Sequence, residues 1–267
     1  MRYAKDSIQL SPSRDLPLLR QILRSEFVTH SQLFDFMRLN HCEHARKSFD
    51  WRLRRLVHRG LVRRQTNPGC TGEFVYSVAS GAAWLLQGMG EYCLVGRARS
   101  KDKEVERGVL HALGLNEIHL SVLRAGLLAR WVGAREVRSQ NELTTFGFAK
   151  DYDAVVTVRT AAGERRFALE YERSPKSMRY YHDVAASLGR ELHVDRVLYL
   201  VCNYDLLRFV SGFFGNGQHR VFFGLVKDWH SQLLDLPVCR CSAARWFRFR
   251  DALDTPATQL ELAMVSV

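Results

Sequence analysis

Three acidic residues in the second half of the chain are spaced so that a β-hairpin would bring them together. Asp153 precedes a short β-branched segment, and Glu170 and Glu172 end the alternating segment that follows it. A turn centred on residues 161–162 places Asp153 directly opposite Glu170, and the two-residue period of a strand puts Glu172 on the same face. Three carboxylates are therefore expected to converge at one end of a hairpin.

Carboxylates that face one another repel, and a hard divalent cation is the usual compensation because it takes oxygen ligands. The expected metal is Mg²⁺ or Mn²⁺, with Asp153, Glu170 and Glu136 as ligands and Glu117 as a further candidate. In a phosphodiesterase this ion would generate hydroxide and neutralise the charge that develops on the phosphate. The alternative is an edge hairpin whose acids are solvated.

The elements that would position these acids form a mixed α/β region. Apolar periodicity predicts the order helix, three strands, helix, strand, and then a further helix and strand. The expected ranges are a helix over 115–131, strands from 136–138 and over 154–158 and 166–171, a helix over 174–191, a strand over 194–202, a helix over 204–213 and a strand over 220–226.

The charge distribution points to a polyanionic partner. The chain carries a formal net charge of +11 and has a pI near 9.7. Residues 1–100 hold 16 basic and 8 acidic side chains, and the segment 46–64 holds eight basic residues against one acid, Asp50. Such a concentration favours nucleic acid, although a solvated helix face has the same composition.

The first hundred residues have the pattern of a winged helix-turn-helix. Short amphipathic helices are expected near 16–23 and 30–38, a basic helix over 47–60 with Gly60 as its stop, and then a hairpin from 61–63 and 74–78. A helix of this kind fits the major groove of double-stranded DNA, and the wing reaches the neighbouring backbone. The expected DNA contacts are Arg46, Lys47, Trp51, Arg52, Arg54, Arg55, Arg59, Arg63 and Arg64. The chain would then divide into a DNA-binding domain, 1–100, and an α/β domain, 101–267.

The acid, hairpin and Glu170-Tyr171-Glu172 arrangement resembles the PD-(D/E)XK nuclease superfamily. Joined to a winged helix, the chain is similar to the replication-relaxation family of plasmid and mobile-element proteins, on His119, Tyr152-Asp153-Ala154 and Glu170-Tyr171-Glu172-Arg173. The resemblance implies a winged helix followed by a nuclease-like αβββαβ domain, with duplex DNA and other mobile-element proteins as partners. Two positions depart from the pattern: Tyr152 replaces a proline, and Glu172 replaces the motif lysine. Lys176 or Arg179 is then the candidate for a displaced cation, and the resemblance implies Asp153, Glu170, Glu172 and Lys176 as the catalytic set.

Several classes are disfavoured by what the sequence lacks. It contains no GxxxxGK[ST], GxGxxG or GxSxG motif, which argues against nucleotide-binding enzymes and α/β-hydrolases. The apolar runs are too short to cross a bilayer, so a cytoplasmic protein without membrane contact is expected. The six scattered cysteines form no CxxC pair and are expected to be reduced thiols.

Three functions fit these patterns. The favoured one is a site-binding accessory factor of a plasmid or mobile element, acting in replication or relaxation, mobilisation or transposition. The others are a Mg²⁺-dependent endonuclease and a winged-helix repressor, and each is compatible with a homodimer. A late segment, 245–250, alternates cations with aromatics, which suits either stacking on a nucleic acid strand or an amphipathic edge strand.

Overall fold

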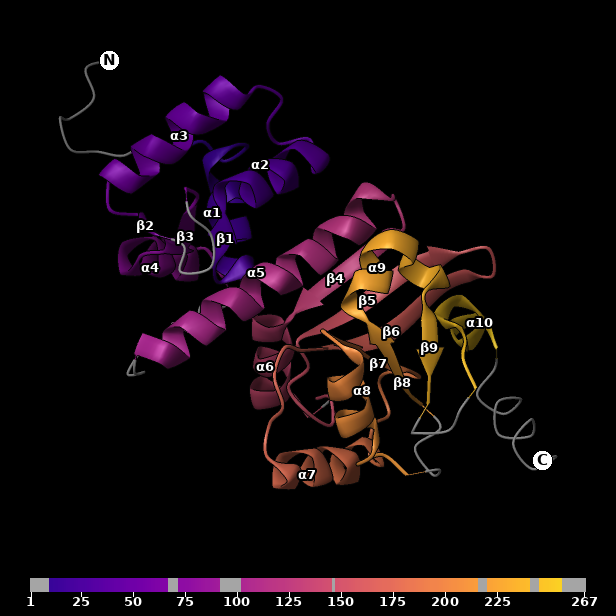
Figure 1. Ribbon diagram of the computed structural model, residues 1–267. Helices are drawn as coiled ribbons and strands as arrows, with labels where there is room; N and C mark the ends of the chain where they lie inside the picture. Colours follow the sequence, from indigo (N-terminus) through magenta and orange to yellow (C-terminus); the bar gives the residue numbers. More distant parts are fainter. Residues whose placement is uncertain are drawn as a thin grey trace, which may run out of the picture. The chain divides into compact units, whose positions relative to one another are not determined.

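The computed structural model describes residues 10–66, 72–91, 102–145, 147–215, 220–240 and 245–255, with the side chains of 102–105 left out. The chain divides into two compact units, Met1–Leu120 (unit 1) and Ser121–Val267 (unit 2) (Figure 1). The mixed α/β class is as predicted. The predicted boundary near residue 100 lies outside the described residues, and the units divide inside a long helix, α5 (Asp102–Arg124).

Unit 1 combines helices with a small antiparallel sheet of strand order β1-β3-β2. Its elements before α5 are α1 (Asp15–Ser25), β1 (Val28–Thr29), α2 (His30–Leu39), α3 (Arg46–His58), β2 (Val62–Thr66), β3 (Phe74–Val78) and α4 (Ser80–Gly88). The predicted succession of two helices, a basic helix and a hairpin is present. The hairpin tip, 67–71, lies outside the described residues.

Local signals explain where these helices start and stop. At the start of α2 the Thr29 hydroxyl accepts from the Gln32 amide at 3.2 Å, and the Gln32 side chain accepts from the Thr29 amide at 3.3 Å. After α3, Gly60 adopts a φ of +68°, which a side chain would disfavour, and so ends the helix as predicted. Along the chain, α3 therefore follows α2 and leads directly into the β2–β3 hairpin.

Unit 2 is built on a seven-stranded mixed sheet of order β10-β9-β8-β7-β6-β5-β4. Its strands are β4 (Leu128–Gly133), β5 (Ala154–Thr160), β6 (Gly163–Glu172), β7 (Val197–Val201), β8 (Val221–Leu225), β9 (Pro237–Cys239) and β10 (Phe247–Arg248). Its helices are α6 (Ala134–Leu143), α7 (Met178–Leu188), α8 (Tyr204–Ser211), α9 (Val226–Gln232), the 3₁₀ turn Leu233–Asp235 and α10 (Phe249–Asp254). Strands β6, β7 and β8 run parallel, and the other pairs are antiparallel.

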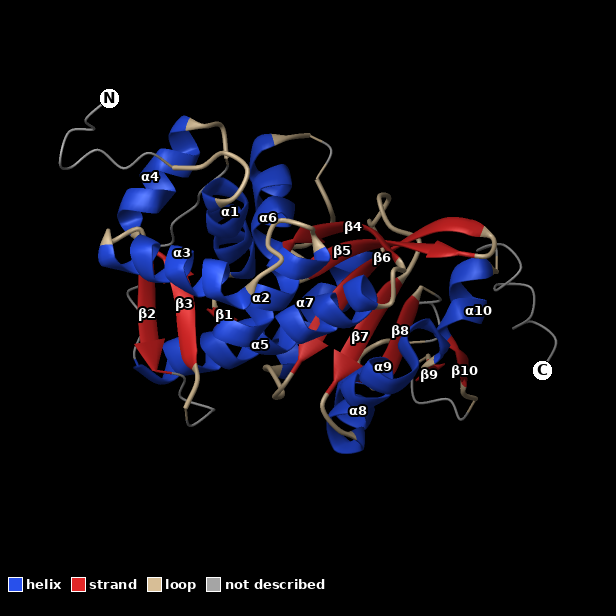
Figure 2. Cartoon of the chain, turned by 90° about the horizontal axis from the view of Figure 1, so that it is seen from above, coloured by secondary structure: helices blue, strands red, loops and turns tan. Residues whose placement is uncertain are grey.

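The two faces of this sheet are covered by different helices (Figures 1 and 2). On one face, buried residues of α6, α7 and α8 form a single core with Ala168, Tyr199 and Phe223 of the central strands. On the other, the Phe167 ring lies 6.4 Å from Trp229 of α9 and 5.0 Å from Phe249 of α10. Covering on both sides accounts for the almost wholly buried parallel strands.

The predicted hairpin is confirmed, and two neighbouring predictions are wrong. Thr160 pairs with Gly163 and Ala154 with Leu169, which is the register expected from the turn position. The predicted helix over 115–131 stops at Arg124, because Gly126 turns the chain at a φ of +69° and β4 then pairs with β5. The predicted strand from 136–138 lies in α6 instead, where the Glu136 carboxylate accepts from the Gly133 amide at the helix start.

Among the described residues, no helix combines the length and apolar character needed to span a membrane. Cys42, Cys202 and Cys239 form no disulfide among the described residues. Cys70, Cys93 and Cys241 lie outside the described residues.

Candidate nucleic-acid interface

Helix α3 presents a continuous exposed stripe. Lys47, Trp51, Arg54 and His58 are spaced four, three and four residues apart, so they lie on one face of the helix, and all four are exposed. The opposite face buries Phe49 with other apolar residues of the helix. Three of the predicted DNA contacts therefore share one surface with His58, a residue that the sequence analysis had not singled out.

The remaining exposed cations lie at the end of α3 and on the hairpin. Arg59 follows the helix, and Arg63 and Arg64 lie on β2. All three side chains are exposed. The Arg64 guanidinium lies 4.4 Å from the centre of the Phe74 ring on β3, which holds it by a cation–π contact. Arg64 thus adds positive charge beside the basic helix, whereas Arg63, the preceding residue of the strand, points to the opposite face of the hairpin.

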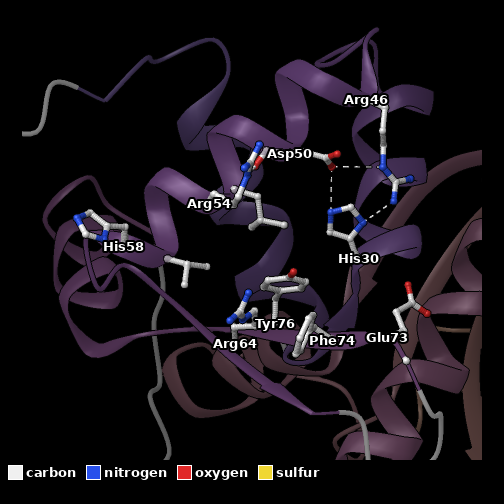
Figure 3. Close-up of a pocket in the computed structure, with 12 residues that line it drawn as sticks. His30, Arg46, Asp50, Arg54, His58, Arg64, Glu73, Phe74 and Tyr76 are labelled. Atoms are coloured by element: carbon white, nitrogen blue, oxygen red, sulfur yellow. Dashed lines mark hydrogen bonds and ion pairs between the residues drawn. The ribbon is translucent and has the colours of Figure 1, made fainter.

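A groove of about 630 Å³ separates α3 from the hairpin (Figure 3). Arg46 Nη2 donates to His30 Nδ1 at 2.5 Å, and His30 Nε2 lies 3.0 Å from Asp50 Oδ1. Burial, reinforced by Arg46, lowers the pKa of His30, so the neutral ring can accept from Arg46 and donate to Asp50. Arg46 is about half exposed, and its guanidinium is already held in place by these two neighbours.

Arg52 was predicted to contact DNA, and the structure places it elsewhere. Its side chain is 8% exposed and points into unit 1, with Nε 2.6 Å from Glu43 Oε1 and Nη1 3.2 Å from Asp15 Oδ1. Both carboxylates are buried. Arg52 is therefore a structural cation that joins α3 to α1 and to the turn preceding α3.

Arg55 is also engaged inside unit 1. It pairs with Asp15 and lies 5.1 Å from the Trp51 ring, which leaves it about one-third exposed. Burial alone would raise the pKa of Asp15, but hydrogen bonds from the Ser11 amide, Arg52 and Arg55 lower it below the ordinary value. A carboxylate held ionised in this way fixes both arginines inside unit 1.

In unit 2, the predicted carboxylates do converge at the end of the hairpin. Glu170 and Glu172 lie on the same face of β6, and each is 2% exposed. Asp153 Oδ2 accepts from the Tyr171 amide at 2.8 Å, beside them. The Asp153 carboxylate thereby satisfies an amide of β6 just beyond the last β5–β6 pair, Ala154 with Leu169.

Two lysines neutralise the buried glutamates. Lys150 Nζ lies 2.8 Å from Glu170 Oε1, and Lys176 Nζ lies 2.8 Å from Glu172 Oε1. The Tyr180 hydroxyl accepts from both, at 3.5 Å from Lys150 and 3.2 Å from Lys176. Burial raises the pKa of Glu170 to about 7 against the opposing effect of Lys150. The five groups form one hydrogen-bonded network under α7.

The network does not fit a resident divalent cation. Three carboxyl groups meet two ammonium groups, and Glu170 Oε1 and Glu172 Oε1 already face lysine. Within the described ranges, no group of three or more His, Cys, Asp or Glu side chains is arranged to hold a metal ion. Glu136 belongs to the start of α6, where it caps the helix, and Glu117 lies on α5 in unit 1.

Other residues of interest have structural environments. His119, matched to the family pattern, belongs to unit 1, where it meets Phe36 edge-on at 4.9 Å and burial lowers its pKa to about 3. Lys150, which the sequence analysis missed, stands in a short polar loop before β5, and no periodicity marks such a position. The Tyr152 hydroxyl donates to Glu191 at 2.8 Å, so the residue in the proline position packs inside unit 2.

Comparison with known proteins returned no protein-family model, curated protein or solved structure that matches this chain.

Replacing Arg52 by alanine should lower the free energy of unfolding by about 3–5 kcal/mol, because Asp15 and Glu43 would lose the cation that neutralises them in the interior. The exposed Arg54, on the same helix, serves as the matched control. Arg54→Ala should change the free energy of unfolding by less than about 0.5 kcal/mol. Urea denaturation followed by circular dichroism measures both variants. Equal stability of the two would contradict the structural role of Arg52.

Millimolar Mg²⁺ or Mn²⁺ should leave the melting temperature of the wild-type protein unchanged, because the lysines occupy the place of a cation. The Lys150→Met/Lys176→Met variant should melt at a lower temperature, and Mg²⁺ should raise it, since three carboxylates are then left without counter-charge. Arg179→Met, at a side chain that is 93% exposed, is the control. A rise in the wild-type melting temperature on adding Mg²⁺ would show that the lysines yield to metal.

Proposed function

We propose that this chain is a double-stranded DNA-binding protein that reads DNA with unit 1. The observation that carries the proposal is the exposed stripe Lys47, Trp51, Arg54 and His58 on α3, flanked by the exposed Arg64 of the hairpin. The element order of unit 1 is the one expected of a winged helix-turn-helix, which supports α3 as the proposed recognition helix.

The physical argument rests on size and charge. An α-helix with its side chains fits the width of the major groove, where arginine can pair with guanine edges and lysine with phosphates. The stripe supplies both residue types, and Arg64 supplies a further cation for the backbone beside the groove. Trp51 adds an aromatic side chain that is 56% exposed in the middle of the stripe.

The buried ion pairs of unit 1 support this arrangement. Because Arg52 is tied to Asp15 and Glu43, α3 is fixed in rotation about its own axis. The exposed stripe is then held outward before DNA arrives, which reduces the ordering cost of binding.

Unit 2 is proposed to assist rather than to cut. Its acids and Lys176 lie together as the nuclease-like pattern expects, but Lys150 also pairs with Glu170, so both buried glutamates already have a counter-charge without a metal ion. Together with the resemblance to replication-relaxation proteins, this supports an accessory role in a plasmid or other mobile element.

Removing two cations of the stripe should weaken duplex binding in a salt-dependent way. For Lys47→Ala/Arg54→Ala, the slope of log K against log salt concentration should become shallower by about 2, since each lost phosphate contact accounts for about 0.9. Fluorescence anisotropy on a mixed-sequence duplex across a salt series measures this slope.

The matched control is Arg138→Ala/Arg179→Ala, which removes the same charge from exposed positions of unit 2. It should keep the wild-type slope. If both double variants keep that slope, the α3 stripe is not the DNA-binding surface. If the slope becomes shallower by the same amount in both double variants, binding depends on net charge and not on the α3 stripe.

A further inference from the structure

A second surface lies in unit 2, at the edge of the sheet where its parallel strands end. Val201 and Leu225, the last residues of β7 and β8, are paired in register, so the two strands end side by side. Tyr204 begins α8 just beyond β7, and Lys227 lies in the first turn of α9 just beyond β8. Figure 2 shows both helices at this edge. Open α/β sheets commonly bind ligands at the carboxyl ends of their strands.

Two exposed aromatic rings meet at this edge, and we call them the Tyr204–Trp246 platform. Their centroids lie 6.3 Å apart and their planes cross at 78°. Tyr204 is 53% exposed and Trp246 is 42% exposed. Because the rings meet edge to face, this contact covers a face of only one of them. Large exposed aromatics are costly to leave in water, and a planar partner would cover them.

Cations accompany the platform. Lys227 Nζ lies 5.5 Å from the centre of the Tyr204 ring, and Arg245 is exposed directly before Trp246. Arg173, also exposed, follows the end of β6, two strand positions away from the end of β8. Two strand spacings amount to about 10 Å. Positive side chains therefore lie on both sides of Tyr204 along the edge.

Residues of the alternating segment 245–250 occupy different environments in the structure. Phe249 is buried in the core, Phe247 contacts Phe222 at 5.8 Å, and Arg250 pairs with Asp235. The edge strand β10 and helix α10 account for these residues. Trp246, which precedes β10, contributes its ring to the platform, and Arg245 is exposed directly before it.

We propose that the Tyr204–Trp246 platform binds single-stranded nucleic acid. Unpaired bases stack on the Tyr204 and Trp246 rings, and Lys227, Arg245 and Arg173 attract the phosphates. This chemistry selects single strands, because every unpaired base offers a free π-face, whereas duplex bases are already stacked on one another. An acidic peptide would match the charge but would leave the aromatic faces uncovered. The proposal does not depend on duplex binding by unit 1.

The test measures binding of labelled oligothymidylate and oligouridylate to the full-length chain by anisotropy and by tryptophan fluorescence quenching. Tyr204→Ala and Trp246→Ala should each weaken binding by about 5- to 100-fold, the loss expected for one stacking aromatic. Trp84→Ala is the matched control, because Trp84 is 73% exposed in unit 1 and should not matter. The oligonucleotide that binds more tightly distinguishes DNA from RNA as the natural strand.

Two further variants keep the outcome decisive. Trp246→Phe retains an aromatic ring, so it should bind within a few-fold of wild type while losing part of the fluorescence quenching. Lys47→Ala/Arg54→Ala should retain single-strand binding, whatever it does to duplex binding. The proposal is overturned if Tyr204→Ala and Trp246→Ala bind both oligonucleotides like wild type, if quenching is unchanged in Trp246→Phe, or if the wild-type chain binds neither strand.

Discussion

A buried charge must be paired, and both units of this protein are organised around that requirement. An ion that leaves water loses several kcal/mol of hydration unless a partner replaces it. In unit 1, Arg52 meets Asp15 and Glu43 and so connects three parts of the chain. In unit 2, Glu170 and Glu172 meet Lys150 and Lys176 beneath α7. Removing one member of either group would leave its partners buried without a counter-charge, which would destabilise the fold.

This requirement divides the ionisable residues into two groups with different roles. Buried and paired side chains stabilise the fold. Several of them are arginines or acids, the residue types that also bind DNA or catalyse reactions on exposed surfaces. Exposed cations give the surface its positive charge, as Lys47 and Arg54 do on α3 and Lys227 does at the edge of the unit 2 sheet. Exposed cations at these two places underlie the binding surfaces proposed for α3 and for the Tyr204–Trp246 platform.

Periodicity predicted much of the fold. The hairpin register and the stop of α3 at Gly60 followed from spacing and turn chemistry alone. Residues 128–131 were assigned to a helix because their apolar spacing fits one, and only pairing with β5 makes them a strand. The inward turn of Arg52 could not be predicted, since its acidic partners lie 37 and 9 residues away. Lys150 was missed for the same reason.

Hydrogen exchange of the full-length chain, with and without a DNA duplex, tests the central claim most directly. The account predicts that duplex binding slows exchange in peptides covering α3 and the β2–β3 hairpin, residues 46–66 and 74–78. Exchange across the sheet of unit 2 should change little. Protection confined to unit 2, with α3 exchanging as in the free protein, would contradict the assignment of unit 1 as the surface that reads DNA.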